Sequence, residues 1–539
     1  MSERQALPNV VLITTDQQRY DTLGVTGNPL VRTPHLDRLA ARGTLFRRGY
    51  IQNPVCIPSR ACLMTGRYVH QHGVDHMNDV IGTTPGLPPW EVTVMERLQQ
   101  VGYRTAGFGK LHMMPPKGLD EMQLTMGKGA RWTVSAGSPL GPSQLGPVYA
   151  AWLEGKRPGA YEEIYAQRRQ PEYRDQATAI VNTLAADEYV DYWIGQNTWE
   201  YLARDHDRPF FVWCGFCGPH PPWDPPEPYA SMYDQDSIPL PPLLHARQQH
   251  VPGEAQRRSR FDGEDGERLI RKIIAYYWGM MTFIDDMVGR LMRTMTERGL
   301  WENTLLIFTT DHGEMLGDYG RTGKSNFAEQ VIRAPYIVVP PGSATPPGGP
   351  EETEEAQGAP AGQRTYDGLV EHVDLVPTIL DYAGIPQPGE LPGRSLRPIL
   401  EGRAGDFDPN PFVICEQASG EPLRPAPSPG PAGAAPGDDR GSATAAPLPA
   451  ARQAQVCLRT ARFKYVFSSP ERRVEFYDLQ EDPLETVNAA DDPRYSAEIR
   501  RHAELLIDHR LQTETNAWQC GLAARTPQAV DHFGRPVRD

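Results

Sequence analysis

Two apolar segments of the sequence end in side chains that can bind a divalent cation. The first ends in Asp16 and Gln17, and the second ends in Asp311 and His312 after the same Thr-Thr pair. Carboxylate and amide oxygens with one imidazole suit Ca²⁺, Mg²⁺ or Mn²⁺. Capping of the following helices is the alternative role for either pair alone. Because both pairs follow matching segments, we predict that these four residues hold one metal ion.

Basic side chains occur at positions that could converge on an anion. They are Arg60, Lys110, His112, His220 and Lys324. Taken singly, each is typical of a solvated surface or a satisfied polar group. Three of the segments that contain them follow predicted strands or turns at strand ends. Cations that gather beside a metal bind compact oxyanions, so we predict a sulfate or phosphate site.

Cys56 lies in the segment "NPVCIPSR" between two prolines. Proline is tolerated in a first helical turn, so we predict a helix that begins near Pro58 and leaves Cys56 just before it. Free backbone N–H groups at a helix start favour negative charge. A nucleophile at this position would face an anionic substrate. Cys214 and Cys217 form a CxxC within an apolar run, and we interpret them as buried thiols.

The predicted elements alternate between strands and helices. Strands are expected at 9–18, 208–220, 304–314 and 336–342, and helices at 35–46, 93–101, 268–298 and 371–385. The continuous apolar runs are typical of strands buried on both faces of a parallel sheet. Ligands of such sheets bind at the carboxyl ends of the strands. The expected fold is α/β, a large doubly wound, mixed or parallel sheet flanked by helices.

The sequence divides into a catalytic domain at 1–404, a smaller α+β domain at 405–518 and a tail at 519–539. The smaller domain should contain an antiparallel sheet, followed by a helix near 495–514. Segments 341–363 and 418–452 are rich in Pro, Ala and Gly, and we expect both to be mobile surface insertions. The tail could contact a neighbouring subunit of a homo-oligomer.

Composition limits the class of partner and the cellular location. The formal net charge of -14 argues against binding to nucleic acid or to an anionic membrane. No run of about 18 or more apolar residues occurs, and the first residues lack the pattern of a secretory leader, so we expect a cytoplasmic protein. Seven scattered cysteines suit reduced thiols better than a disulfide framework.

The segment "CIPSRACLMTGR" resembles the Cys-x-Pro-Ser-Arg signature of the type I sulfatases, in the alkaline-phosphatase-like superfamily. The metal-ligand and Lys/His positions follow in the family's order, and the segment at 463–488 is similar to the family's closing sheet. In that family a formylglycine-generating enzyme oxidises the cysteine to Cα-formylglycine. The resemblance therefore implies this modification at Cys56.

The resemblance also implies a role for each candidate site residue. Asp16, Gln17, Asp311 and His312 match the metal ligands, and the modified Cys56 completes the set. Arg60 matches the residue that supports the formylglycine. Lys110, His112, His220 and Lys324 match the groups that bind the sulfuryl oxygens and the leaving oxygen.

Two features bear on the branch of the family. The Asp-Gln and Asp-His pairs resemble the choline-sulfatase and phosphonate monoester hydrolase branches. An amide in place of a carboxylate, together with an imidazole, favours Mn²⁺ relative to Ca²⁺. By contrast, Lys110 and His112 keep the Lys-x-His of sulfatases. Asn78 is either a further oxyanion contact, as in the phosphonate branch, or a turn residue.

The implied activity is hydrolysis of sulfate monoesters by one hydroxyl of a formylglycine gem-diol at position 56, beside one Ca²⁺ or Mn²⁺ ion. Asp311 would accept a proton or hold the alkoxide, and His220 with Lys324 would serve the leaving oxygen. The main alternative is a phosphonate monoester hydrolase or phosphodiesterase that uses the same site. A non-catalytic sulfate-ester binder is a further alternative.

A cysteine hydrolase would need a base beside Cys56, and the histidines nearest in sequence are His70, His72 and His76. The leaving-group pocket is expected to involve residues 113–180 and the turn after His220. Its candidate aromatic residues are Trp132, Tyr161 and Trp223, which could equally be packing residues.

Overall fold

The computed structural model describes residues 7–75, 86–113, 116–125, 127–128, 147–246, 259–343, 364–419 and 453–514. The two predicted insertions fall almost entirely outside these ranges, as do the tail at 519–539, Asn78, His76 and Trp132. The boundary between the two domains stays a prediction.

An eight-stranded mixed sheet forms the centre of the catalytic part, which confirms the expected α/β class. Its strands, in spatial order, are β10 (Arg364–Tyr366), β2 (Thr44–Phe46), β9 (Tyr336–Val339), β7 (Thr304–Thr310), β1 (Asn9–Asp16), β6 (Phe210–Pro219), β4 (Arg104–Gly109) and β5 (Glu121–Leu124). Strand β9 runs antiparallel to both of its neighbours, and the other pairs are parallel.

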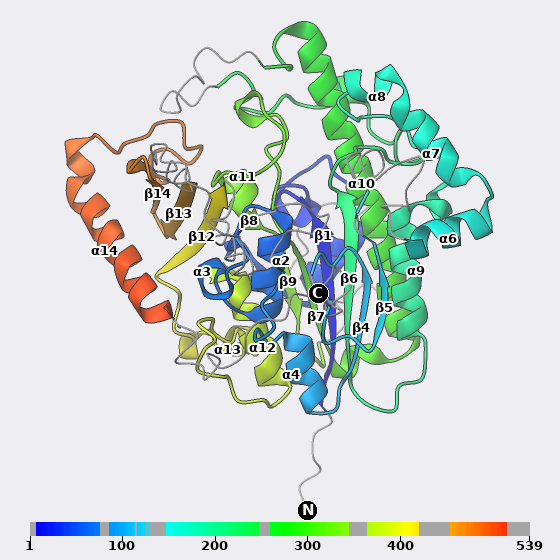
Figure 1. The fold of residues 1–539 in the computed structure, drawn as a ribbon, viewed down its shortest axis with the longest axis horizontal. Coiled ribbons are helices and arrows are strands. Elements are labelled where there is room, and N and C mark those ends of the chain that lie inside the picture. Colours follow the sequence, from blue (N-terminus) through cyan, green and yellow to red (C-terminus); the bar gives the residue numbers. More distant parts are fainter. Residues whose placement is uncertain are drawn as a thin grey trace, which may run out of the picture.

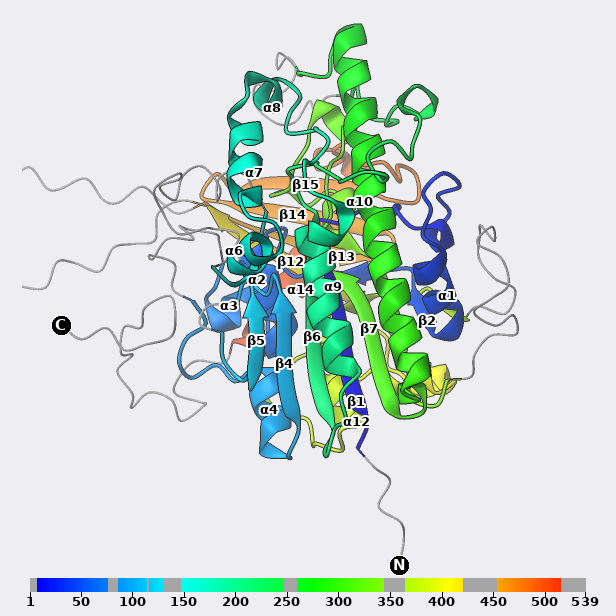
Figure 2. The ribbon, with the colours of Figure 1, turned by 90° about the vertical axis from the view of Figure 1, so that its right-hand side faces the viewer.

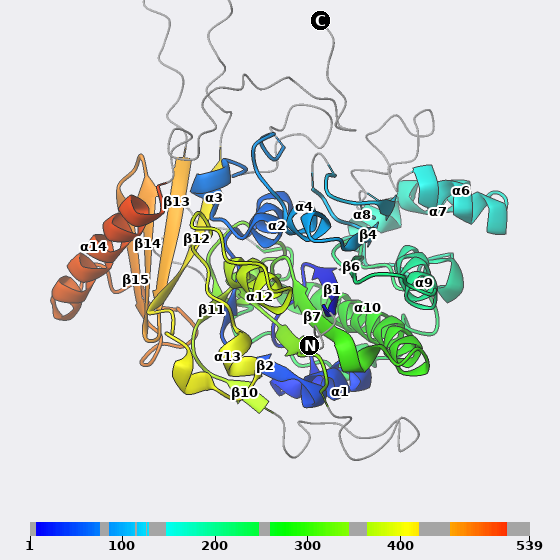
Figure 3. The same cartoon turned by 90° about the horizontal axis from the view of Figure 1, so that it is seen from below.

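Both faces of this sheet are buried under helices, as the continuous apolar strands predict. Along β1, Val11 and Ile13 face one core cluster, whereas Val10 and Leu12 face the other. The first face is covered by α1 (Pro34–Arg42), α9 (Val190–Leu202) and α10 (Gly263–Glu297), and the second by α2 (Cys56–Thr65), α4 (Val94–Gln100) and α12 (Leu375–Tyr382). Figure 3 shows this three-layer arrangement.

Three smaller groups of elements surround the sheet. Helices α6 (Pro147–Lys156), α7 (Ala160–Arg169) and α8 (Pro171–Asp175) stack beyond the carboxyl ends of β4 and β5 (Figure 2). A second sheet has the order β11 (Val370–Glu371), β3 (Gly49–Tyr50) and β8 (Arg333–Ala334). The short helices α3 (Val69–His72), α11 (Glu329–Ile332) and α13 (Arg397–Leu400) lie in the connections.

The C-terminal part forms its own antiparallel sheet, as expected. Its order is β12 (Phe412–Ser419), β13 (Gln453–Thr460), β14 (Phe463–Ser469) and β15 (Arg473–Asp478), and α14 (Ser496–Thr513) packs on it (Figure 1). The predicted helix near 495–514 is therefore confirmed. Among the helices of the described ranges, none is long and apolar enough to cross a membrane.

Two local predictions need correction. The helix expected over 35–46 ends at Arg42, because Gly43 closes it and the next three residues pair with β9 and β10 as strand β2. The helix expected near Pro58 begins at Cys56, with the extended Val55 as its N-cap. Cys56 therefore belongs to the first turn of α2 and does not precede it.

Candidate active site

The carboxyl ends of four neighbouring parallel strands bring the predicted site residues together. Strands β1 and β7 pair in register, so Asp16 and Asp311 emerge beside each other. Lys110 follows β4 and His220 follows β6, which lie on the other side of β1. This edge of the sheet is where open α/β folds bind their ligands.

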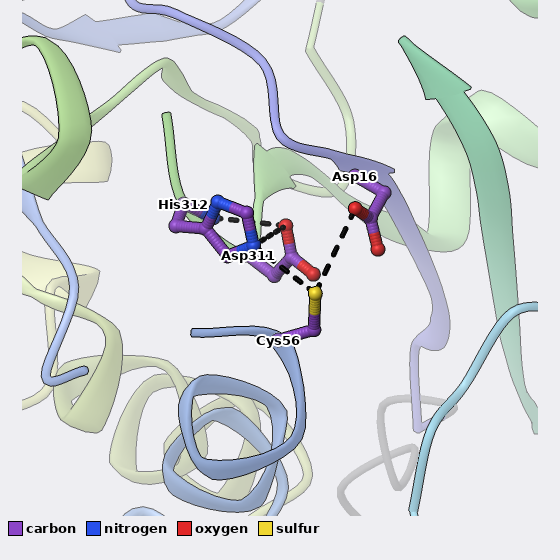
Figure 4. Close-up of side chains that lie close together, drawn as sticks. All are labelled: Asp16, Cys56, Asp311 and His312. Carbon is purple, nitrogen blue, oxygen red and sulfur yellow. Dashed lines mark hydrogen bonds and ion pairs between the residues drawn. The ribbon is translucent and has the colours of Figure 1, made fainter. Parts of the chain in front are cut away.

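Four side chains from three segments form a compact buried cluster (Figure 4). One ligand atom from each of Asp16, Cys56, Asp311 and His312 lies within 4.8 Å of all the others. The Cys56 sulfur is 3.8 Å from Asp16 Oδ1 and 3.2 Å from His312 Nε2. The predicted ligands therefore do converge, and Cys56 points at them from the start of α2.

Gln17 follows Asp16 directly and adopts a left-handed backbone with φ of 67°. Its backbone N–H donates to Asp311 Oδ1 over 3.0 Å, and its side-chain Nε2 donates to Glu314 Oε2. The side-chain oxygen Oε1 is buried and has no hydrogen-bond partner among the described residues. A buried unpartnered carbonyl is costly unless something binds it.

The donor set fits a divalent metal ion. It comprises carboxylates from Asp16 and Asp311, the orphan oxygen of Gln17, and Nε2 of His312, whose Nδ1 lies 2.9 Å from the carbonyl of Gly313. The contact of Nδ1 with the Gly313 carbonyl fixes the His312 ring with Nε2 toward the cluster. Oxygen ligands with one imidazole suit Ca²⁺, Mg²⁺ and Mn²⁺.

Arg60 lies one helical turn after Cys56 and is fully buried. Its Nε donates to Asp311 Oδ2 over 2.8 Å, and its NH2 donates to Asp16 Oδ2 over 3.0 Å. The remaining nitrogen donates to the backbone carbonyl of Lys110. Arg60 therefore fixes both carboxylates, in addition to the support of residue 56 that the resemblance implies.

Two lysines and one histidine contact the cluster from different sides. Lys110 Nζ is 2.7 Å from Asp16 Oδ2, and Lys324 Nζ lies 2.7 Å from Cys56 Sγ and 2.9 Å from His312 Nε2. His220 Nε2 is 4.0 Å from Asp16 Oδ1. The predicted cations thus meet around residue 56, where an oxyanion would bind.

The other candidate histidines have different surroundings. His112 follows Lys110 by two residues, is buried, and adopts a left-handed backbone with φ of 49°. His72 Nε2 lies 3.2 Å from Cys62 Sγ, and His70 Nδ1 lies 3.0 Å from Glu416 Oε2. Since neither His70 nor His72 is placed beside Cys56, they do not supply the base that a cysteine hydrolase requires.

Electrostatics set the protonation states of the cluster. Burial by itself would raise the pKa of Asp16, but the charges of Lys110 and the other cations hold this pKa well below its usual range. Burial and the charge of Lys324 lower the pKa of His312 to about 4. Burial, aided by Asp16, raises the pKa of the Cys56 thiol. An ionised aspartate and a neutral imidazole are ready to ligate metal, whereas the protonated thiol is a poor nucleophile.

Two buried groups near the site were not anticipated from the sequence. Glu314 binds the Gln17 amide, and its place three residues after Asp311 was an available signal. Lys128 Nζ donates to Tyr189 and to the carbonyl of Pro222, in the turn after His220. Nothing in the sequence around Lys128 indicates these partners, since all of them are distant along the chain.

The aromatic residues proposed for the leaving-group pocket receive limited support. Trp223 is buried in the main core cluster, and Tyr161 packs against that cluster from α7. Both positions favour the packing role that the sequence left open. Trp132 lies outside the described residues.

The mixed sheet, the separate antiparallel sheet and the polar cluster at the strand ends agree with the fold and site that the resemblance of the Cys56 segment implies. The sulfatase family model matches residues 8–385, and the chain belongs to the sulfatase family. The family resemblance of the Cys56 segment is therefore confirmed.

The similarity to known proteins extends over nearly the whole chain. The chain is 26% identical over 505 residues to an arylsulfatase of Clostridium perfringens, covering 93% of this chain and 94% of that protein. It is 28% identical over 545 residues to the multifunctional alkaline phosphatase superfamily protein PehA of Trinickia caryophylli, covering 93% and 95%. The phosphonate monoester hydrolase structure of Agrobacterium radiobacter has a TM-score of 0.70 at 23% identity, covering 94% and 96%. At that identity the structural likeness shows the fold.

Proposed function

We propose that this protein hydrolyses sulfate monoesters with residue 56 as its nucleophile, after oxidation of Cys56 to formylglycine. The observation that carries the proposal is the placement of Cys56 within its Cys-x-Pro-Ser-Arg segment. The side chain lies among Asp16, His312 and Lys324, at the carboxyl edge of the sheet. Membership of the sulfatase family and the arylsulfatase relative support it.

The hydrated aldehyde would supply the attacking oxygen. A Ca²⁺ or Mn²⁺ ion at this site would lower the pKa of the attacking hydroxyl and offset the charge of the substrate. The residues that would hold this ion are Asp16, Gln17, Asp311, His312 and residue 56. Asp311 is well placed to receive the proton, because its carboxylate is locked in position. Oδ2 accepts from Arg60, and Oδ1 accepts from the backbone N–H groups of Gln17 and His312 over 3.0 and 2.9 Å.

Lys110 and Lys324 would bind the equatorial oxygens of the sulfuryl group. Their ammonium groups approach the cluster from the β4 end and from the loop before α11, so an anion between them meets two fixed cations. Such preorganised donors stabilise the charge that develops in a transition state. His112, two residues after Lys110, belongs to the same proposed oxyanion site.

His220 would serve the leaving oxygen. Its Nδ1 lies 2.6 Å from the carbonyl of Pro221, which can only accept, so the Nδ1 proton is fixed there and Nε2 faces Asp16. Burial and the charge of Lys110 lower the pKa of His220 well below its usual range. A bound sulfate ester adds negative charge and raises this pKa again, so the ring can take up a proton and deliver it to the departing alkoxide.

Hydrolysis of phosphonate monoesters or phosphodiesters is the second candidate function. Phosphate diesters and phosphonate monoesters carry one negative charge, as sulfate monoesters do, so one oxyanion site can accept all three. The multifunctional relative and the presence of Gln17 and His312 in the ligand set favour this side activity. Lys110 and His112, in the sulfatase arrangement, favour sulfate as the main substrate.

A panel of substrates tests the proposal. The full chain is produced together with a formylglycine-generating enzyme, as the proposal requires, and kcat/KM is measured for an aryl sulfate, a phosphodiester and an aryl phosphonate monoester. The largest value is expected for the sulfate. A larger value for either phosphorus ester would make the second candidate the main function.

We also propose that the protein is cytoplasmic, and fractionation of producing cells checks this location.

A further inference from the structure

Glu314 is a buried carboxylate to which the proposed mechanism assigns no step. It lies three residues after Asp311 and has no exposed surface. Its Oε2 accepts a hydrogen bond from Gln17 Nε2, and its Oε1 accepts from the backbone N–H groups of Leu316, over 3.2 Å, and Gly323. One carboxylate therefore binds both the neighbour of Asp16 and the residue that precedes Lys324.

The contact with Gln17 decides which end of the amide is left available to a cation. A carboxylate accepts hydrogen bonds, so it binds the NH₂ end of the amide and turns the carbonyl end away. Gln17 Oε1 is the atom left buried and unpartnered. Without Glu314 the amide could rotate and present N–H groups, which cannot bind a cation.

The contact with Gly323 holds the loop that carries Lys324. Met315 N–H also donates to the carbonyl of Gly323 over 2.9 Å, so the two ends of the loop are tied together. Lys324 Nζ then lies 2.7 Å from Cys56 Sγ. Loss of the Glu314 contact would free the Gly323 N–H and the lysine beside it.

We propose that Glu314 is a positioning residue that fixes the Gln17 carbonyl toward the metal position and the Lys324 ammonium over residue 56. The inference rests on the metal site that forms part of the proposed function. It adds a residue that links metal binding to the geometry of the oxyanion site. Hydrogen-bonding partners of metal ligands have this effect in other metal sites, where their loss weakens metal affinity by about 10- to 100-fold.

Metal affinity is the first readout, because it is independent of turnover. Mn²⁺ and Ca²⁺ are titrated by calorimetry into the full chain with Cys56→Ala, so that incomplete maturation has no influence. In this background Glu314→Gln is expected to weaken metal binding by about 10- to 100-fold. After Gln17→Ala, Glu314→Gln should cause no further loss, because it acts through Gln17.

Asp318→Asn is the matched control. Asp318 is a buried carboxylate in the same loop, and it accepts from Arg19 NH1 over 2.9 Å and from Leu243 N over 3.4 Å. This variant should leave metal affinity unchanged. If Glu314→Gln does not fold, as judged by thermal melting, Glu314→Asp replaces it, because the shorter side chain cannot reach both Gln17 and Gly323.

Kinetics of the matured enzyme are the second readout. At saturating Mn²⁺, Glu314→Gln should lower kcat by up to about 100-fold, the usual effect of misplacing a reacting group by about 1 Å. In the Lys324→Ala background, Glu314→Gln should cause no further decrease in kcat.

The outcomes separate this inference from the proposed function. Unchanged affinity in Glu314→Gln, an equal loss in Asp318→Asn, or additive losses with Gln17→Ala would each overturn the positioning role. If neither the Cys56→Ala protein nor the matured protein with residue 56 in place binds either metal, the metal site and this inference are overturned together. Metal affinities that follow the prediction, in a matured enzyme without sulfatase activity, would leave the role of Glu314 in place and refute the function.

Discussion

Two buried charge clusters of this protein differ in how their charges balance. The first joins the C-terminal sheet to the catalytic part. Lys464 on β14 lies 3.0 Å from Glu329 and also contacts Glu485, and Arg459 Nε is 3.4 Å from Glu329. Two cations thus face two carboxylates, and the Lys464 ammonium also donates to the carbonyl of Phe327 over 2.7 Å.

The second cluster surrounds residue 56. Among the described residues, three cations, Arg60, Lys110 and Lys324, surround residue 56 and the two carboxylates of Asp16 and Asp311, whereas the buried Glu314 contacts Gln17 and the loop of Lys324. It also contains Gln17 Oε1, which is buried without a hydrogen-bond partner among the described residues, whereas the buried Glu485 Oε1 of the interface cluster contacts the Lys464 ammonium. A balanced cluster holds two parts of a protein together, whereas surplus positive charge beside an orphan ligand oxygen attracts an anion and a metal.

Removal of the nucleophile should give the largest effect. Cys56→Ala is expected to lower kcat for an aryl sulfate by about 10⁴-fold or more, because no other side chain can form the covalent intermediate. The melting temperature should stay close to that of the parent. Residual activity close to the parent value would show that residue 56 is not the nucleophile.

Removal of a cation from the interface cluster should affect stability alone. Lys464→Met leaves Glu329 and Glu485 with a single cation, which is expected to cost about 3–5 kcal/mol of unfolding free energy. Urea denaturation measures this loss, and kcat of the folded enzyme should be unchanged. Arg462→Ala is the control, because its pair with Asp478 is half exposed on the arginine side and should contribute far less to stability than a buried pair. A fall in kcat for Lys464→Met would contradict the division between the clusters.

Removal of a cation from the catalytic cluster should show the reverse pattern. Lys324→Ala removes one oxyanion donor, which is expected to cost roughly 3 kcal/mol of transition-state stabilisation, or about 100-fold in kcat. Its effect on unfolding should be small, since the lysine is only partly buried. Steady-state kinetics and melting of the same preparation check both parts. A stable variant with unchanged kcat would remove Lys324 from the oxyanion site.

The pH dependence of stability should reveal the interface cluster. Burial opposes ionisation of Glu329, but Lys464 and Arg459 outweigh it and lower the pKa to about 2, from 4.5. This carboxylate therefore stabilises the fold above pH 4.5, and the contribution is lost as the pH falls toward 2. The loss should be about 2 kcal/mol or less, because burial raises the pKa of the neighbouring Glu485 and opposes it. Denaturation from pH 6 to pH 3 measures the slope, and an equal slope in Glu329→Gln would contradict the assignment.

The sequence predicted the parts of the fold that depend on local pattern. The apolar runs predicted strands β1, β6 and β7. Because ligands of such sheets bind at the carboxyl ends of the strands, the same runs also predicted that Asp16, Asp311 and His220 lie at one edge of the sheet. The prediction of a helix for residues 44–46 was wrong, because the pairing of these residues with β9 and β10 outweighs the helical pattern that precedes them. Tertiary pairing of this kind leaves no signal in a short window.

The parts of the site that depend on long-range contacts could not be predicted. Sequence spacing does not show that Arg60 bridges two carboxylates, or that Lys324 lies against residue 56. Glu314 was overlooked because its role depends on the orientation of the Gln17 amide, which only the folded chain defines. The partners of Lys128 come from three distant segments.

Mass spectrometry of the peptide that contains residue 56 tests the central claim most directly. The protein is produced with a formylglycine-generating enzyme, and the peptide is compared with that of a preparation made without it. The account predicts an aldehyde at residue 56, seen as the mass of formylglycine and its hydrate, and sulfatase activity in proportion to the converted fraction. Full activity with an unmodified Cys56 thiol would contradict it.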